Sequence, residues 1–254
     1  MNRLKLVSVV WKATRMQYCR FDTAAAYGNE EWLGRALKLC GKRRRNLFVT
    51  TKLSNSNQRS GDVRLHFKNS LSRLGLKYLD LYLMHWPNPD TYLNSWKQME
   101  LLYEEGLVRA IGVCNFHQHH LEKLFKIANV VPAINQIELH PMLSQKNLAD
   151  FCERNTIKVE AYSPLARMHD KLIKNKTLAS IAQKHNKSVP QVILRWNYQN
   201  GHLSVPKSSN LLRLKENISI FNFTLSNNEM FSIDQLNCNF RVRYDPDNCD
   251  FNKL

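Results

Sequence analysis

Phe21-Asp22-Thr23-Ala24-Ala25-Ala26-Tyr27-Gly28-Asn29-Glu30 is the stretch that decides the fold. A short apolar run ends at Asp22, and Tyr27 follows five positions later, just before a predicted helix start. A buried carboxylate costs free energy unless it is paired or hydrogen-bonded. Asp22, at the end of a predicted strand, therefore requires a cationic partner from elsewhere in the chain.

Two further polar side chains each close another predicted strand. Lys52 follows the strand predicted at 47–51, and His85 follows the strand predicted at 79–84. Residues that end parallel strands gather at one end of the sheet, where α/β proteins place their active sites. Together with Asp22, the pattern indicates chemistry at one end of a parallel sheet.

Predicted strands alternate with predicted helices over the whole chain. Seven strands are expected, at residues 18–23, 47–51, 79–84, 108–113, 133–138, 158–162 and 203–205. This alternation is typical of parallel strands joined by crossover helices. Because no linker or change of composition interrupts the pattern, residues 1–254 are expected to form one domain.

The helices are predicted from apolar spacing and from capping residues. They are expected from Asn29 to a stop at Gly41, from about Asp62, around Trp96–Met99–Leu102, and at about 117–128, 147–153, 172–185, 189–198, from near Asn210 and at 227–236.

Residues 3–17 are harder to assign. Leu6, Val9, Val10 and Ala13 have helical spacing, whereas the β-branched valines leave a strand open. An eight-stranded barrel would need one strand more than the seven counted, and within this sequence only the residues before 18 could supply it.

Composition narrows the class of protein. The chain has 254 residues, of which 43% are hydrophobic, enough for one large core. No apolar run approaches the roughly 18 residues of a membrane span, and no signal peptide is recognised. The six cysteines have no C-x-x-C spacing, so reduced thiols and a cytoplasmic location are expected.

The formal charge of +16 is large and favours anionic ligands such as nucleotides. It also leaves open a salt-dependent contact with DNA or RNA. No basic stripe interleaved with aromatics and no zinc-finger spacing is present, so specific nucleic-acid binding is not expected. His117, His119 and His120 fit no standard metal-ligand spacing, and we interpret them as a solvated helix start.

Several blocks of the sequence resemble the aldo-keto reductases, and in particular compact bacterial members such as the diketogluconate reductases. The blocks lie at residues 21–30, 50–52, 83–87, 106–116, 135–141, 161–165 and 205–208. The resemblance implies a (β/α)8 TIM-type barrel that reduces aldehydes or ketones with NADPH and without metal. It implies a small-molecule carbonyl substrate and no membrane, and we expect a monomer or a weak homo-oligomer.

The resemblance also implies a catalytic tetrad. Tyr27 would be the acid/base, Lys52 the modulator of its acidity, Asp22 the partner of Lys52, and His85 the residue that orients the carbonyl. The chemistry fits, because a phenol has a pKa of about 10 and a nearby ammonium favours its ionised form. Trp86 would line the substrate pocket.

The same resemblance assigns the cofactor residues. Tyr162 would stack on the nicotinamide, Asn115 and Gln136 would bind its carboxamide, and Lys207, Ser208 and Arg213 would hold the 2′-phosphate. Glu216 and Asn217 would reach the adenine, and the full set is Asn115, Gln136, Tyr162, Ser163, Leu165, Lys207, Ser208, Arg213, Glu216 and Asn217. Arg167, in the loop after Tyr162, would contact the pyrophosphate.

The chain departs from the family pattern at its start, where no first strand is recognisable. Two arrangements are open: residues 6–11 form a makeshift strand, or the first strand position is vacant. A start that is truncated or wrongly assigned is a third explanation. The intact tetrad favours a working reductase, whereas the missing strand favours a non-catalytic relative that binds a nucleotide or a partner.

Overall fold

The computed structural model describes residues 3–253, which divide into two compact units. The first unit comprises Met1–Asn135 together with Pro246–Leu254, and the second comprises Gln136–Asp245. That residues 1–254 form a single domain stays a prediction.

The described residues contain seven strands, and their order in the sheet follows their order in the chain. They are β1 (Arg20–Asp22), β2 (Phe48–Leu53), β3 (Leu81–Met84), β4 (Ile111–Cys114), β5 (Ile134–Glu138), β6 (Lys158–Tyr162) and β7 (Leu203–Ser204). β1, β2, β3 and β4 pair in parallel within the first unit, and β6 pairs in parallel with β7 in the second. The predicted α/β fold with parallel strands is confirmed, and the seven strands are those of a TIM-type barrel without its first strand.

The predicted strand cores are right, and the ends differ by a few residues. β6 has the predicted bounds, whereas β3 and β4 begin two or three residues later than predicted. Leu79 and Val108 still form an isolated parallel bridge. Between that bridge and β3, the buried Asp80 carboxylate accepts a hydrogen bond from the Val49 main-chain N–H at 2.9 Å. The hydrogen-bond ladder between the strands is interrupted here, because the Asp80 carboxylate replaces a main-chain oxygen as the acceptor.

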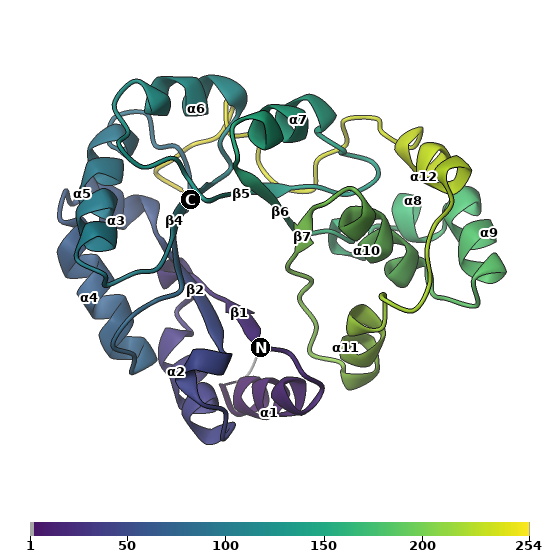
Figure 1. The fold of residues 1–254 in the computed structure, drawn as a ribbon, viewed down its shortest axis with the longest axis horizontal. Coiled ribbons are helices and arrows are strands. Elements are labelled where there is room, and N and C mark those ends of the chain that lie inside the picture. Colours follow the sequence, from purple (N-terminus) through teal and green to yellow (C-terminus); the bar gives the residue numbers. More distant parts are fainter. Residues whose placement is uncertain (1–2, 254) are drawn as a thin grey trace. The chain divides into compact units, whose positions relative to one another are not determined.

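The first unit contains six α-helices within its described residues. They are α1 (Arg3–Arg15), α2 (Glu30–Leu39), α3 (Asn55–Arg59), α4 (Val63–Leu74), α5 (Tyr92–Glu104) and α6 (Gln118–Phe125). α4 and α5 contact the strands that they connect, and Figure 1 shows α2, α4 and α5 along one side of β1, β2 and β4. The short polar helix α3 has no apolar periodicity and was not predicted.

Helix α1 settles the assignment of the N-terminal residues. Leu6, Val9, Val10 and Ala13 are buried, as helical spacing predicts, and the helix contacts α2. The alternative that residues 6–11 form a makeshift strand is wrong. Within residues 3–19 the structure has no strand.

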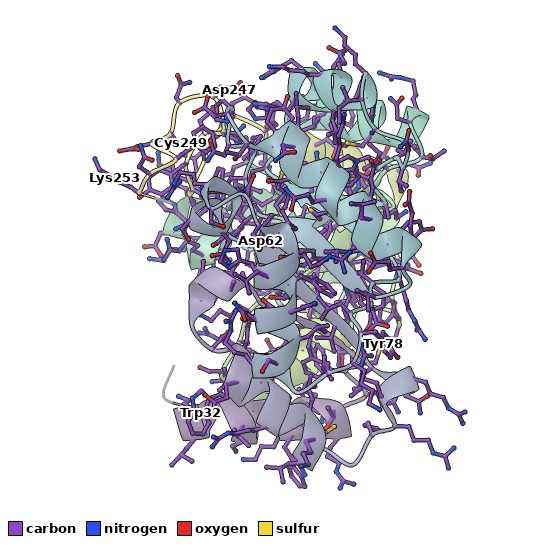
Figure 2. The ribbon with its side chains drawn as sticks, turned by 90° about the vertical axis from the view of Figure 1, so that its left-hand side faces the viewer. Trp32, Asp62, Tyr78, Asp247, Cys249 and Lys253 are labelled. Atoms are coloured by element: carbon purple, nitrogen blue, oxygen red, sulfur yellow. The ribbon has the colours of Figure 1, made fainter. Side chains whose placement is uncertain are left out.

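Helices α2 and α4 approach each other closely at one glycine. A Cβ atom on Gly34 would lie 2.3 Å from the main-chain oxygen of Leu74. A side chain at position 34 would force the two helices apart, because a backbone oxygen cannot rotate away. The first unit extends from this region, where Trp32 is labelled in Figure 2, to the C-terminal tail, where Asp247 and Lys253 are labelled.

The second unit contains six α-helices. They are α7 (Lys146–Arg154), α8 (Asp170–Ile173), α9 (Lys176–Lys184), α10 (Val189–Gln199), α11 (Leu211–Ile218) and α12 (Asn227–Asp234). The single helix predicted at 172–185 is wrong, because α8 and α9 are separate. Asn175 divides them: its backbone is extended, and its side chain accepts a hydrogen bond from Leu178 N–H as an N-cap.

No helix among residues 3–253 is long and apolar enough to cross a membrane. The six cysteines, all among these described residues, are thiols and form no disulfide. The cytoplasmic location inferred from these features stays a prediction.

Candidate active site

Lys52 lies near the end of β2 and is almost fully buried, with 1% of its side chain exposed. Its ammonium forms an ion pair with the Asp22 carboxylate at the end of β1. It also donates a hydrogen bond to the Thr23 main-chain oxygen at 3.0 Å. The parallel register of β1 and β2 brings the two strand ends together, so the pairing predicted for Asp22 is present.

Two opposing effects act on the pKa of Lys52. Burial disfavours the ammonium and lowers the pKa. The negative charge of Asp22, assisted by Tyr27 and Cys114, outweighs that loss, so the pKa lies above its ordinary value. Lys52 is therefore a fixed positive charge over the whole neutral range.

Tyr27 stands beside this charge in the first unit. It closes the short 3-10 turn Ala25–Tyr27, which ends at Gly28 with φ of 60°, and 52% of the tyrosine is exposed. The Lys52 Nζ lies 5.3 Å from the centroid of the Tyr27 ring. The His85 ring meets the same ring edge-on at 5.7 Å between centroids. The structure thus brings all four predicted tetrad residues into one group, with the phenol as its exposed member.

Asn115 and Trp86 are both linked to His85, Asn115 by a hydrogen bond and Trp86 as the next residue in the chain, and both are mostly buried. The Asn115 side-chain amide donates a hydrogen bond to the main-chain oxygen of His85 at 2.9 Å, and its φ is 63°. Trp86 is 5% exposed, and its main-chain oxygen accepts a hydrogen bond from the Gln58 amide at 3.1 Å. Whether Trp86 lines a substrate pocket stays a prediction.

In the second unit, Gln136 and Tyr162 lie on β5 and β6. The buried Gln136 amide donates a hydrogen bond to the Glu160 carboxylate at 2.7 Å. Tyr162 is half-buried at the end of its strand. Glu160 was not predicted as a partner of Gln136, although an acid in the middle of an apolar strand is a signal for a buried polar pair.

Seven of the predicted cofactor residues line one cavity of about 460 Å³ in the second unit. They are Ser163, Leu165, Lys207, Ser208, Arg213, Glu216 and Asn217. Arg167, Met168, Pro190 and Val205 also line it. Of these, Pro190 comes from helix α10 and carried no signal in the sequence, because its contribution depends on how the helix packs.

The cavity presents positive charge around the start of helix α11. Lys207 and Arg213 are both exposed. The Asn210 side chain caps the helix by accepting from the N–H groups of Leu212 and Arg213 at 2.9 and 3.2 Å. The two cations and the positive end of the helix dipole suit an anionic group such as a phosphate.

The loop after β6, which also lines the cavity, has an unusual backbone. Ser163, Ala166, Arg167 and Met168 all have positive φ, between 43° and 64°. For residues other than glycine this region is costly, and such strain gathers at functional sites. The exposed Arg167 of this loop lines the same cavity as Lys207 and Arg213, and it adds a third cation to the lining.

The predicted helix start at His117 is confirmed, because His117 is the N-cap of α6. The description of the three histidines as solvated is only partly right. His119 is exposed, whereas His120 is buried and completes the capping box.

Comparison with known proteins agrees with the family resemblance found in the sequence. Residues 1–238 match the family model described as "Aldo/keto reductase family". The chain is 48% identical over 235 residues to a glyoxal reductase of Bacillus subtilis (strain 168), an alignment that covers 92% of this chain and 84% of the relative.

Solved structures agree with the sequence match. An aldo-keto reductase, MGS-M4, from a Medee basin deep-sea metagenome library superposes with a TM-score of 0.95 at 40% identity, covering 98% of this chain and 92% of that chain. A Bombyx mori aldo-keto reductase (AKR2E4) in complex with NADP superposes with a TM-score of 0.91 at 35% identity, covering 97% and 87%.

Proposed function

The chain belongs to the aldo/keto reductase family, and from that premise we propose that it reduces an aldehyde or ketone to an alcohol with NADPH. The observation that carries the proposal is the buried Lys52, which is ion-paired with Asp22 and lies 5.3 Å from the Tyr27 ring centroid. A permanent positive charge beside an exposed phenol serves a reaction that needs a proton donor at neutral pH.

The proposed chemistry joins a hydride and a proton to one carbonyl group. NADPH, when bound, supplies the hydride to the carbonyl carbon. Tyr27 gives its phenolic proton to the carbonyl oxygen, and Lys52 stabilises the phenolate that remains. Asp22 keeps Lys52 charged and fixed in place. The phenolate then recovers a proton from solvent, to which it is open.

His85 has a separate proposed role. Its ring lies edge-on to Tyr27 at 5.7 Å, so a carbonyl oxygen that reaches the phenol also comes close to the imidazole. A hydrogen bond from His85 would orient the carbonyl and stabilise the charge that develops on its oxygen. Trp86 is proposed to shape the substrate pocket.

The proposed nucleotide is NADPH rather than NADH because of the charge in the second unit. Lys207 and Arg213 line the same cavity as Ser208, and two cations at a helix start favour a phosphate dianion. Glu216 and Asn217 are proposed to contact the adenine. The other residues proposed to bind the cofactor, on its nicotinamide side and in the loop after β6, are Asn115, Gln136, Tyr162, Ser163 and Leu165.

Short dicarbonyl aldehydes are the first substrates to try. The 48%-identical relative from Bacillus subtilis is a glyoxal reductase. The phenol of Tyr27 is exposed, so a small aldehyde can reach it from solvent. We propose glyoxal and similar small aldehydes as the substrate class, and a monomer or weak homo-oligomer as the working form.

The test compares wild type with Tyr27→Phe. Oxidation of NADPH is followed by its absorbance, with glyoxal and a panel of other aldehydes, and NADPH binding is measured by calorimetry. We expect Tyr27→Phe to lower kcat by about 10²–10⁴-fold, the usual contribution of a general acid, and to leave NADPH affinity unchanged. Tyr198→Phe is the matched control, because Tyr198 is also about half exposed (51%) and lies on α10.

Two outcomes would reject the proposal. Wild-type protein that binds NADPH but turns over no carbonyl in the panel would support the alternative, a non-catalytic nucleotide-binding or partner-binding relative. Full activity of Tyr27→Phe would keep the reductase but remove Tyr27 as its proton donor.

A further inference from the structure

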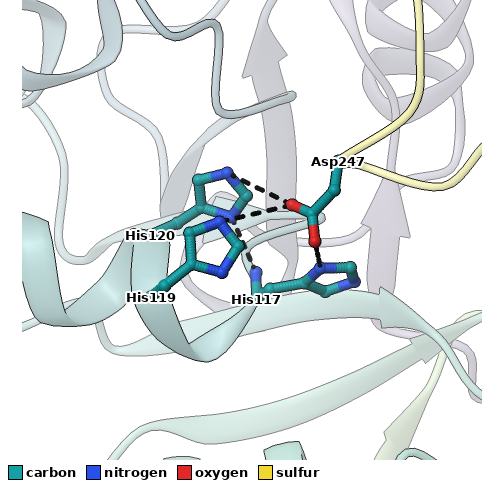
Figure 3. A group of neighbouring side chains, drawn as sticks. All are labelled: His117, His119, His120 and Asp247. Carbon is teal, nitrogen blue, oxygen red and sulfur yellow. Dashed lines mark hydrogen bonds and ion pairs between the residues drawn. The ribbon is translucent and has the colours of Figure 1, made fainter.

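Three histidines and one aspartate converge at the start of helix α6 (Figure 3). The His117 Nδ1 lies 2.8 Å from one oxygen of the Asp247 carboxylate, and the His119 Nε2 lies 3.3 Å from the other. The His120 Nε2 is 3.7 Å from Asp247. One candidate ligand atom from each of the four residues lies within 4.8 Å of the others.

His120 differs from the other two histidines because one of its ring nitrogens is already engaged. Its Nδ1 accepts a hydrogen bond from the His117 main-chain N–H at 3.1 Å. In a neutral imidazole whose Nδ1 accepts, the proton is on Nε2. A protonated nitrogen cannot bind a metal, so His120 in this arrangement positions the turn and is not a ligand.

The other two histidines and the carboxylate lie close enough together to bind one metal ion. Zinc binds imidazole nitrogens and carboxylate oxygens at about 2.0–2.2 Å in a tetrahedron, whose edges are therefore roughly 3.3 Å long. His117 Nδ1 lies 2.8 Å from one Asp247 oxygen, His119 Nε2 lies 3.3 Å from the other, and the candidate ligand atoms all lie within 4.8 Å of one another, so a small adjustment would bring them to this spacing. We propose that His117 Nδ1, His119 Nε2 and the Asp247 carboxylate bind a divalent metal ion of the zinc type, with water in the fourth position.

The ligand set selects the class of metal. Two imidazoles and one carboxylate suit zinc and its first-row neighbours, whereas magnesium and calcium prefer oxygen ligands. The site is open to solvent, because His119 is 60% and Asp247 40% exposed at the side chain. Metal can therefore enter without any opening of the structure.

The metal would fasten the C-terminal tail to the start of helix α6 within the first unit. Asp247 lies in the tail Pro246–Leu254, and the tail is also held where the Arg59 guanidinium of α3 donates to the Phe251 main-chain oxygen at 2.9 Å. The family match ends at residue 238, so Asp247 lies outside it. The proposed site uses none of the residues assigned to the reductase reaction.

The experiment uses the full chain without a histidine tag, freed of metal with a chelator. Calorimetric titration with Zn²⁺ is expected to show one ion per chain, with a Kd on the order of 1 µM or tighter. Zn²⁺ at about 100 times the Kd should raise the Tm by roughly 5–10 °C. Co²⁺ should give the visible spectrum of a tetrahedral site, and Mg²⁺ should not bind.

Two variants and one control make the test specific. His119→Ala and Asp247→Asn are each expected to weaken Zn²⁺ binding by at least about 100-fold, with unchanged Tm in chelator. His66→Ala removes a histidine of α4 whose ring pairs with the Ser60 hydroxyl, and it should bind Zn²⁺ as wild type does. The proposal is overturned if wild type shows no saturable binding below about 1 mM Zn²⁺, or if His119→Ala and Asp247→Asn bind as tightly as wild type.

Discussion

The side-chain amide of Asn115 donates a hydrogen bond to the main-chain oxygen of His85 at 2.9 Å. Asn115 directly follows β4 and His85 directly follows β3, and these strands pair in parallel. The hydrogen bond therefore joins two neighbouring strand ends at the point where both carry predicted site residues. Asparagine also tolerates the left-handed φ of 63° at this position better than most residues do.

Asn115→Asp separates this hydrogen bond from the shape of the side chain. Aspartate has the same size and also tolerates a left-handed backbone, but its carboxylate cannot donate to the His85 oxygen. We expect kcat/KM to fall by about 10–100-fold, which corresponds to the loss of roughly 1–3 kcal/mol for a buried hydrogen bond. Steady-state kinetics checks this, and an unchanged kcat/KM would mean that the strand ends are held by other contacts.

Lys52→Met tests whether the buried ammonium serves the reaction. The variant keeps a long side chain but removes the charge that stabilises a Tyr27 phenolate, so kcat should fall by about 10²–10⁴-fold. Lys174→Met is the matched control, because its ion pair with Asp170 is solvent-exposed and should contribute little. Equal kcat values for the two variants would show that Lys52 has only a structural role. Urea unfolding of both variants separates that role from catalysis.

Lys207→Met and Arg213→Met test the preference for NADPH. Each removes a cation from the cavity, and each should weaken NADPH binding by about 10–100-fold while changing NADH binding little, because a charge-assisted hydrogen bond contributes about 1.5–3 kcal/mol. Lys215→Met, also on α11 but outside the cavity lining, is the control. An equal loss for both nucleotides would place these cations away from the 2′-phosphate.

Glu229 makes the second unit sensitive to acid. Burial raises the pKa of its carboxyl, but hydrogen bonds from Lys184, the Ser226 N–H and His185 outweigh burial and bring the pKa to about 2. Because the folded pKa lies below the ordinary 4.5, the stabilisation is complete above pH 4.5 and is lost as the pH falls toward 2. We expect a contribution of about 1–2 kcal/mol, since Lys184 is itself exposed to solvent.

The measurement is urea unfolding at neutral and acidic pH for wild type and Glu229→Gln. The difference between the two should be largest at neutral pH and should shrink below pH 4.5. Glu153→Gln, which removes an exposed carboxylate from α7, should stay close to wild type. A difference that persists unchanged at pH 3 would mean that packing, and not charge, holds Glu229.

Sequence alone predicted the strand ends that carry the site, because each is an apolar run closed by a charged or polar residue. For α1 the helical spacing of the apolar residues indicated the face that is buried, but the β-branched valines left a strand open. The sequence could not predict α3, which is polar and five residues long, and it merged α8 with α9 because the cap at Asn175 depends on the backbone rather than on periodicity.

The site could be predicted only as far as local patterns extend. The tetrad residues each lie in a short recognisable block. The contact between the three histidines and Asp247 could not be predicted from the sequence, because Asp247 lies 130 positions beyond His117 and no spacing rule connects them. The same holds for Pro190, which lines the cavity of the second unit only because of how α10 packs.

The division of the chain between Asn135 and Gln136 separates two kinds of chemistry along the sequence. The residues proposed to transfer the proton precede this division, and those proposed to bind the 2′-phosphate follow it. On this proposal, substitutions in the later segment would change the nucleotide preference without altering the group that transfers the proton. For protein engineering, residue 135 is therefore a natural crossover point. A chimera that joins the earlier segment of this chain to the later segment of an NADH-preferring relative should use NADH and keep Tyr27 as its proposed proton donor.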